Sequence, residues 1–343
     1  MALRHGDTLI FPTPPVIAAG AAVGGKKEGE GPLAGCFDEL CRDNRLGQPT
    51  WEAAERALLV RTARLCLQKD PSGGPVDLAL AGDLQAQCTA SGYAMRELGL
   101  PFAGVFGACS TMAEAIGLAA ALCAGGMADG VLAMASGHFC AAERQFRTPL
   151  CYGAFRTPTA QWTATAAGCC LLRPARQGAA GKAQVRAVTF GRVQDYGVRD
   201  ITNMGAAMAP AAAATLLRYL ADTGAGAADF DCVYTGDLGR VGSALLAGLL
   251  EREGLAGLRH ADCGCLLYGN DKRVGSGASG PGCCASVLAG QILPQLAAGR
   301  MQRVLFIATG ALMSQTTFLQ KESIPAVAHL VELASPAWKE GSA

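Results

Sequence analysis

One cysteine stands where the sequence could hold a nucleophile. Cys109 lies in the sequence Phe-Gly-Ala-Cys-Ser, directly before an apolar, alanine-rich stretch that predicts a buried helix. The free N–H groups and the dipole at the start of a helix favour a thiolate, so this placement should lower the pKa of the thiol. The alternative is that Cys109 is a small buried residue like the other members of a set of 15 cysteines.

Positive charge gathers in one part of a nearly neutral chain. The 343 residues include 29 Lys/Arg and 28 Asp/Glu, and this balance argues against nucleic acid as the main partner. Between Ala141 and Arg218, however, ten Lys/Arg stand against three Asp/Glu. Such a stretch serves an anionic ligand or a negatively charged surface, or it is simply a solvated face.

Other motifs have both a functional and a simpler structural interpretation. Asp83 and Asp237 each follow a predicted strand in Gly-Asp-Leu, so both either cap the next segment or, in the case of Asp83, line a cleft beside Cys109. The cysteines and histidine between His260 and Cys265 are spaced too tightly for zinc, and no metal site is predicted. The glycine-rich run 275–280 lacks the Lys and Ser/Thr of a phosphate loop and predicts a flexible turn that enters a helix.

Alternating helices and strands must position these residues. A helix is predicted over Trp51–Gln68, with Thr50 as its N-cap, and a second over 110–125. Short apolar runs predict buried strands at 76–82, 105–107 and 130–136. This alternation indicates an α/β architecture with buried sheets.

An internal repeat divides the chain in two. Residues 77–84 recur at 231–238, an offset of 154, and residues 126–137 recur at 299–310, an offset of 173. The difference places an insertion of 19 residues in the second copy, around 251–277. We therefore predict two similar halves, residues 1–190 with the Cys109 turn and residues 191–343. The chain contains 65 alanines and 45 glycines, which let helices and strands of such halves approach closely.

The cellular setting can also be predicted. No signal peptide opens the chain, because Arg4, His5 and Asp7 precede any apolar run, and no apolar stretch resembles a membrane span. The 15 cysteines are expected to be mostly reduced and buried. These features predict a cytoplasmic protein with no transmembrane segment of its own.

A duplicated α/β chain of this length, with a cysteine at a strand-to-helix turn, resembles the thiolase superfamily and, within it, ketoacyl-synthase III-like enzymes. The resemblance implies a five-layer αβαβα sandwich of two duplicated halves, in which the cysteine is the nucleophile. Condensing enzymes also use a His after the first strand of the second half and an Asn in the loop equivalent to the cysteine turn. This chain has Gly236 and Asp237 at the first place and Pro281 at the second, so the catalytic set is incomplete.

A more specific resemblance covers residues 11–331. The segments 31–38, 106–111, 136–147, 204–213 and 320–329 resemble the family of stage V sporulation protein AD, although Cys140, Cys151, Gly137 and Phe139 depart from its pattern. That family binds dipicolinic acid (pyridine-2,6-dicarboxylate), alone or with Ca²⁺, and loads it into the developing spore with membrane partners. The resemblance implies a non-catalytic protein of sporulation and spore germination, peripheral to the spore inner membrane, that partners other stage V sporulation membrane proteins. It also implies that no cofactor is needed, Ca²⁺ entering only with the ligand.

The chemistry of this ligand selects site residues. A flat dianion needs cationic or N–H donors at both carboxylates and an apolar surface for its ring. The residues expected to supply or border these groups are Asp83, Cys109, Ser110, His138, Arg144 and Arg147. Each has a simpler reading, such as a surface arginine or a structural histidine.

Two other functions remain open. In the first, the protein is an acyltransferase or condensing enzyme with Cys109 as acyl nucleophile and His138 as an unorthodox base. In the second, it is a structural scaffold at the membrane. Likeness to thiolase-fold enzymes also predicts a homodimer formed through the first half.

Overall fold

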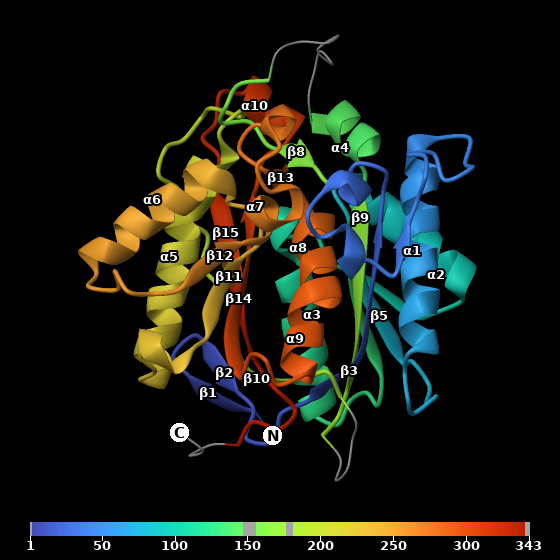
Figure 1. Cartoon of the computed structure of the whole chain (residues 1–343), viewed down its shortest axis with the longest axis vertical. Helices are drawn as coiled ribbons and strands as arrows, with labels where there is room; N and C mark the ends of the chain where they lie inside the picture. The colour runs from blue at the N-terminus through green and yellow to red at the C-terminus, as the bar shows by residue number, and fades with distance from the viewer. Residues whose placement is uncertain (1, 147–155, 176–180, 340–343) are drawn as a thin grey trace.

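The computed structural model describes residues 2–146, 156–175 and 181–339, which form five layers (Figure 1). From one side to the other these are a helix pair, a sheet, a central helical layer, a second sheet and an outer helix pair, as the contacts between elements also show. The fold is therefore the αβαβα sandwich that the family resemblance implies.

The first half supplies one sheet and its helices. Its principal strands are β3 (Val16–Gly24), β5 (Leu78–Gly82), β6 (Phe102–Gly104), β7 (Val131–Gly137) and β9 (Ala166–Arg173). They lie in the order β3-β9-β7-β5-β6, with β5 parallel to β6 and β7 and with β9 antiparallel to β3 and β7. The helices are α1 (Trp51–Gln68), α2 (Thr89–Leu98), α3 (Thr111–Ala124) and α4 (Phe139–Phe146).

The second half repeats this arrangement. Its principal strands are β10 (Ala183–Thr189), β11 (Cys232–Thr235), β12 (His260–Asp262), β14 (Arg303–Ala311) and β15 (Ala326–Ala334), in the order β10-β15-β14-β11-β12. Its helices are α5 (Met204–Thr223), α6 (Gly239–Arg252), α7 (Cys263–Tyr268), α8 (Pro281–Val287), α9 (Leu293–Ala297) and α10 (Gln315–Leu319). Strand for strand, the order and direction match the first half, so the repeat seen in the sequence is a repeat of structure.

Short elements complete the chain. A hairpin of β1 (Leu3–His5) and β2 (Thr8–Ile10) pairs with β10, and β10 also pairs with β3, which joins the two halves into one continuous sheet. β4 (Glu39–Leu40) pairs with β3, and β8 (Trp162–Thr163) pairs with β13 (Ala278–Ser279). By strand correspondence β10 groups with the second half although it precedes the predicted boundary between residues 190 and 191, and that boundary stays a prediction. No helix in the described part of the chain is long and apolar enough to cross a membrane.

Local sequence explains several of these elements. Helix α1 has the predicted bounds, and its N-cap Thr50 accepts a hydrogen bond from the Ala53 N–H. The predicted strand at 105–107 is wrong, because the pairing with β5 is made by Phe102–Gly104. The chain leaves the sheet at Val105, whose carbonyl oxygen would lie 2.0 Å from a Cβ at Gly82.

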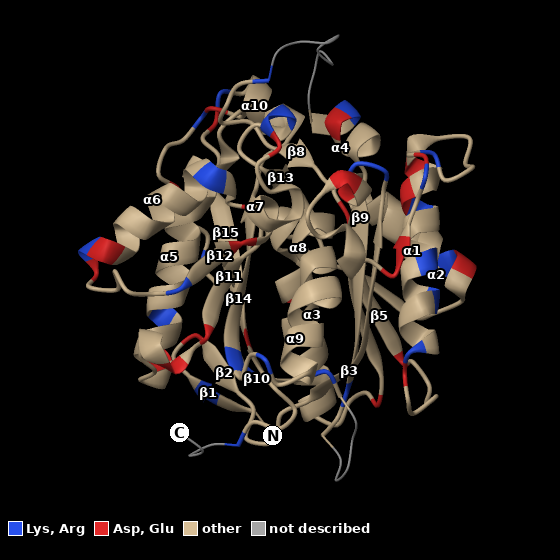
Figure 2. Cartoon of the chain, in the orientation of Figure 1, with Lys and Arg blue, Asp and Glu red and all other residues tan. Residues whose placement is uncertain are grey.

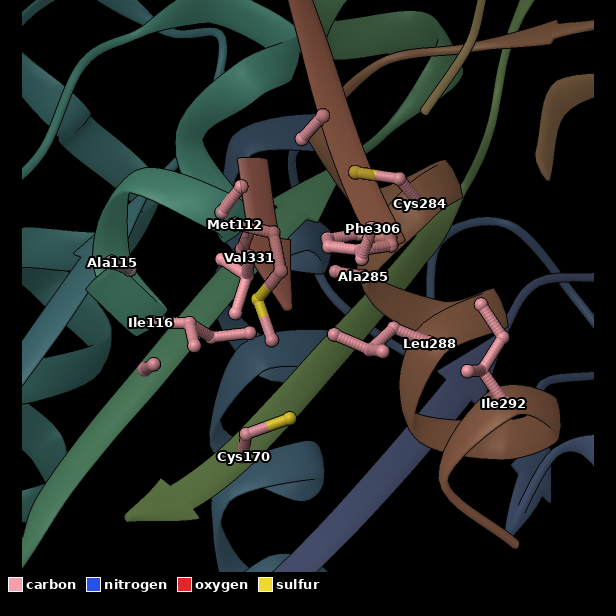
Figure 3. Packing of buried hydrophobic residues seen from close by; sticks show 14 of the residues in the cluster. Met112, Ala115, Ile116, Cys170, Cys284, Ala285, Leu288, Ile292, Phe306 and Val331 are labelled. Carbon is pink, nitrogen blue, oxygen red and sulfur yellow. The ribbon is translucent and has the colours of Figure 1, made fainter. Parts of the chain in front are cut away.

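The central layer shows why alanine and glycine are so frequent. A Cβ at Gly168 in β9 would lie 2.2 Å from the backbone of Ala285 in α8, and one at Gly282 would lie 2.1 Å from the Ala166 carbonyl oxygen. Larger residues fill the remaining space between the sheets: Met112 and Ile116 of α3, Leu288 after α8 and Phe306 of β14 belong to one buried cluster (Figure 3). Small residues at the closest contacts thus let α3 and α8 fit between two sheets.

Candidate functional site

The Cys109 turn is held by both halves of the molecule. Residues 108–110 form a short 3-10 turn before α3, with Ala108 at a φ of +52°. The Ser110 hydroxyl donates a hydrogen bond of 2.6 Å to the Gly107 carbonyl. From the second half, Gly310 of β14 packs so closely that a Cβ there would lie 2.4 Å from the same carbonyl oxygen. The turn is therefore fixed against β14 rather than free to move.

The Cys109 side chain faces a buried polar network of the second half. The thiol is buried, with 5% of the residue exposed, and its Sγ lies 3.9 Å from the Ser279 Oγ. Ser279 in turn donates to the Asp237 carboxylate at 3.0 Å. Asp237 also accepts hydrogen bonds from the Gly280 N–H at 2.9 Å and from the Thr309 hydroxyl at 3.0 Å.

Burial dominates the electrostatics of this network. Asp237 has no exposed surface, and its desolvation raises the pKa of the carboxyl to about 6. Burial, and next the nearby Asp237 carboxylate, raise the pKa of the Cys109 thiol well above its ordinary value. The expected lowering of this pKa by the helix dipole is therefore wrong, because burial and a negative neighbour outweigh the dipole. The site holds a neutral thiol rather than a thiolate.

Neither His nor Asn stands at the two places where the resemblance to condensing enzymes implies them. A Cβ at Gly236 would lie 3.2 Å from the Ala308 Cα and the Thr309 N, so a larger side chain meets β14. Pro281 is the first residue of α8 and follows Gly280, whose φ of +96° suits glycine. Gly236 and Pro281 provide no polar side chain to Cys109, and the nearest ionisable group at the first place is the Asp237 carboxylate rather than an imidazole.

His138 has the contacts of a structural histidine. It is fully buried between β7 and α4, its Nε2 lies 2.7 Å from the Asn44 carbonyl oxygen, and its ring lies 5.6 Å from that of Trp51. Desolvation lowers the pKa of the imidazole, which keeps it neutral. The neutral ring can donate from Nε2 to Asn44 and accept at Nδ1 from the Ala141 N–H, 3.5 Å away.

Asp83 belongs to a second buried network, beside α1. Its carboxylate accepts hydrogen bonds from the Gln85 and Ser91 backbone N–H groups and from the Ser91 hydroxyl, at 2.7 to 2.9 Å. Gln85 then donates to Glu55 of α1 at 2.7 Å, and Ser136 donates to the other Glu55 oxygen at 2.9 Å. These bonds give Asp83 the capping role weighed from the sequence, while its counterpart Asp237 is the carboxylate beside Cys109.

The basic side chains differ in how they are held. Arg144 of α4 forms an ion pair with Glu52 of α1, and its side chain is 53% exposed. Arg147 lies outside the described residues. Arg156 was not singled out from the sequence; its side chain is 20% exposed and lies 3.2 Å from the buried Glu143 carboxylate.

An aromatic pair lies next to the cysteine network. The rings of Phe139 and Trp162 stack with centroids 4.1 Å apart, and the Arg156 guanidinium lies 4.7 Å from the Trp162 ring centroid. Because β8, which contains Trp162, pairs with β13, the stack is one strand away from Ser279. Ser279 and this aromatic stack were not predicted from the sequence, and Asp237 was predicted only as a capping residue. The repeat could have pointed to part of this network. At the offset of 173, Thr309 of β14 corresponds to Ser136 of β7, and each hydroxyl donates to a buried carboxylate, Asp237 and Glu55 respectively.

The residues considered for zinc are used as structural groups. Asp262 caps α7 by accepting from the Cys265 N–H, and His260 contacts the Thr235 hydroxyl through its Nε2 at 2.8 Å. Among the residues that the structure describes, no group of three or more His, Cys, Asp or Glu is arranged to hold a metal ion. The described cysteines are all free thiols.

Comparison with known proteins identifies relatives in sequence and in fold. The family model described as Stage V sporulation protein AD matches residues 5–334. The chain is 40% identical over 331 residues to Stage V sporulation protein AD of Bacillus subtilis (strain 168), covering 96% of this chain and 97% of the relative.

Solved structures extend the similarity at the level of the fold. Cerulenin-bound OleA of Xanthomonas campestris matches with a TM-score of 0.59 at 14% identity, over 97% of this chain and 99% of that one. The 3-oxoacyl-[acyl-carrier-protein] synthase III of Aquifex aeolicus matches with a TM-score of 0.56 at 11% identity, over 93% and 99%. At these identities the likeness establishes the thiolase-like fold alone.

Proposed function

Because the chain belongs to the Stage V sporulation protein AD family, we propose that it is a non-catalytic thiolase-fold protein that binds dipicolinic acid and supports its uptake into the developing spore. The observation that carries the non-catalytic part is the setting of Cys109. Its thiol is buried beside Asp237, its pKa is raised, and Gly236-Asp237 and Pro281 stand where the resemblance to condensing enzymes implies the catalytic His and Asn. A cysteine so placed is a poor nucleophile.

The ligand would lie between the Cys109 turn and α4. At the N-terminal turn of α3, around Cys109 and Ser110, the helix dipole would favour one carboxylate, and the Ser110 N–H would have to exchange its present partner, the Gly107 carbonyl at 3.0 Å, to donate to it. Arg144 would leave its ion pair with Glu52 and bind the second carboxylate of the ligand. Arg147 is proposed as a further donor to the ligand. The Phe139–Trp162 stack would supply the apolar surface for the ring. We give Asp83 and His138 positioning roles, since their hydrogen bonds hold the segments around the turn.

Calorimetric titration tests this proposal. We expect dipicolinate to bind the wild-type protein, to bind Cys109→Ala with part of its affinity, and to bind Arg144→Ala at least about tenfold more weakly, the loss typical of one charge-assisted contact. Arg252→Ala, at an exposed position of α6, is the matched control and should bind as wild type does. Parallel titrations with and without Ca²⁺ decide whether the chelate is the ligand. Absence of binding by both dipicolinate and its calcium chelate would exclude the proposal.

An acyltransferase that uses Cys109 is the alternative. It requires a thiolate, which the raised pKa opposes. It predicts a covalent adduct after incubation with acyl-CoA, seen as a mass increase of the intact protein and lost in Cys109→Ala. If no adduct forms across short, medium and long acyl chains, this alternative is excluded.

We also propose that the protein forms a homodimer through β6 and acts with membrane-embedded sporulation proteins at the spore inner membrane. β6 is the last strand in the sheet order, and all three of its residues are exposed. Phe102 in the strand, with Tyr93 and Phe106 nearby in the chain, adds exposed aromatic surface. An edge of this kind pairs readily with a second copy. Light scattering should give twice the monomer mass for the wild type and the monomer mass for Phe102→Asp. A monomeric wild type would exclude the dimer.

A further inference from the structure

A small pocket lies apart from the Cys109 turn, between the β1–β2 turn, the segment that follows β10, and α5. Its volume is about 160 Å³, and its lining includes Asp7, Phe190, Arg192, Gln194, Ala214 and Arg218. Arg192 and Arg218 belong to the basic stretch of the sequence, and the function proposed above uses neither of them. A cavity of about 150 Å³ is large enough for one benzene ring.

Cationic side chains converge at the rim of this pocket. The Asp7 Oδ2 lies 2.8 Å from an Nη of Arg192 and 3.6 Å from the Nε of Arg218. The hydrogen bond from Arg192 is the largest influence on the Asp7 carboxyl, and together with Arg218 and Arg4 it lowers the pKa of that group. Three guanidinium groups thus act on one carboxylate, and 69% of the Arg192 side chain is still exposed to solvent.

The base of the pocket is apolar. Phe190 is half-buried; its ring packs on α3, where a Cβ at Gly117 would lie 3.0 Å from its Cζ, and meets the His329 ring edge-on with centroids 5.8 Å apart. The Thr215 hydroxyl, which also lines the pocket, donates to the Ala328 carbonyl at 3.0 Å. Ala214 of α5 adds a methyl group. The pocket therefore joins a cationic rim to a surface that favours a flat apolar body.

The backbone beside the pocket is sterically restricted at Gly191. A Cβ at Gly191 would lie 1.9 Å from the Ala328 carbonyl oxygen and 2.5 Å from the Thr215 hydroxyl oxygen, so this position needs glycine. The Gly191 N–H also donates to the Nδ1 of His329 at 3.2 Å. The wall that carries Phe190 and Arg192 is thus fixed in place before any ligand arrives, which lowers the cost of binding.

We propose that this pocket is a second ligand site, which takes a small carboxylate with a flat apolar body and in which the Asp7 carboxylate occupies the anion position when no ligand is bound. The ligand carboxylate displaces Asp7 from Arg192 and Arg218, and its apolar part rests on Phe190 and Ala214. This pocket shares no residue with the site proposed at the Cys109 turn, so the two proposals can be tested separately.

Benzoate is a suitable probe, because it joins one carboxylate to one ring. We expect Asp7→Asn to bind benzoate up to about fivefold more tightly than wild type, since the internal competitor is removed and an exposed ion pair is worth up to about one kcal/mol. Arg218→Gln and Arg192→Gln should each bind at least about fivefold more weakly, and Arg252→Gln should bind as wild type does. Thermal melting of each variant checks that the β1–β2 hairpin still folds. If Asp7→Asn does not fold, the two arginine variants still test the proposal.

The position of the probe completes the test. A crystal soaked with 4-bromobenzoate should show an anomalous bromine peak beside Phe190. A peak only at the Cys109 turn, or benzoate affinities that none of the variants changes, would overturn the proposal. Inorganic phosphate is the control anion: if it binds as tightly as benzoate and displaces it, the apolar base contributes nothing and the assignment to a carboxylate with a flat body is wrong.

Discussion

Glu55 should make the stability of the protein depend on pH in a way that one substitution removes. Its carboxyl is buried, with 1% of the residue exposed, between α1 and the end of β7. Desolvation, and next the neighbouring Asp83 carboxylate, raise the pKa of Glu55 from 4.5 to about 8. The folded protein therefore holds a proton that the unfolded chain releases above pH 4.5.

The direction and size of the change in unfolding free energy with pH follow from proton linkage. Between pH 4.5 and 8 the folded state binds about one more proton at this site, so the free energy of unfolding falls as pH rises. One proton corresponds to about 1.4 kcal/mol per pH unit. The stabilisation is complete below the unfolded pKa and lost as pH passes the folded one. Glu55→Gln resembles the protonated acid: its amide oxygen can accept from Gln85 and its NH2 can donate to the Ser136 hydroxyl, which then acts as the acceptor, so this variant should escape the loss.

Urea unfolding at several pH values between 5.5 and 7.5 measures this effect. The stability of Glu55→Gln relative to wild type should rise by about 1.4 kcal/mol for each pH unit. The matched control is Glu52→Gln, on the same helix, where a lowered pKa confines any pH effect to more acidic solution. Wild-type and Glu55→Gln curves that run parallel across this range would refute the assignment of a protonated, buried Glu55.

Three further substitutions test the site and the core. Asp237→Asn removes the negative charge beside Cys109, so the thiol should react faster with iodoacetamide at pH 8, by roughly a few-fold; an unchanged rate would mean that burial alone protects it. Gly310→Ala places a methyl group 2.4 Å from the Gly107 carbonyl oxygen, so thermal melting should show a destabilisation of about 1–3 kcal/mol, while an unchanged midpoint would show that the turn can shift. Phe306→Ala, in the layer between the sheets, should cost about 3–5 kcal/mol in urea unfolding, and a loss below about 1 kcal/mol would contradict the packing in Figure 3.

Charged residues are rare in the central layer, where α8 and α9 contain none and α3 contains only Glu114, and this pattern helped to make the fold predictable. In Figure 2, Lys, Arg, Asp and Glu gather on the outer helices and at the ends of the sheets. The bounds of α1 follow from Thr50 and the spacing of apolar residues, which are local signals. The repeat at offsets 154 and 173 adds the relation between the halves, because the repeated blocks became β5 with β11 and β7 with β14.

The contacts of the site depend on segments that are distant in sequence. Cys109 could be identified from its turn, but its neighbours Asp237, Ser279 and Thr309 come from three separate elements of the second half. No local pattern states that Asp237, rather than its repeat partner Asp83, lies beside the thiol. For the same reason the pKa of the Cys109 thiol is raised rather than lowered as expected. The position at the start of a helix is visible in the sequence, whereas burial beside Asp237 is not.

A crystal structure with dipicolinate tests the central proposal most directly. We expect density for the ligand between the N-terminal turn of α3 and α4, with one carboxylate at Cys109 and Ser110, the other near Arg144, and no covalent bond to the Cys109 sulfur. Density continuous with that sulfur, or a saturated crystal in which the space beside the Cys109 turn stays empty, would contradict a non-catalytic ligand site there.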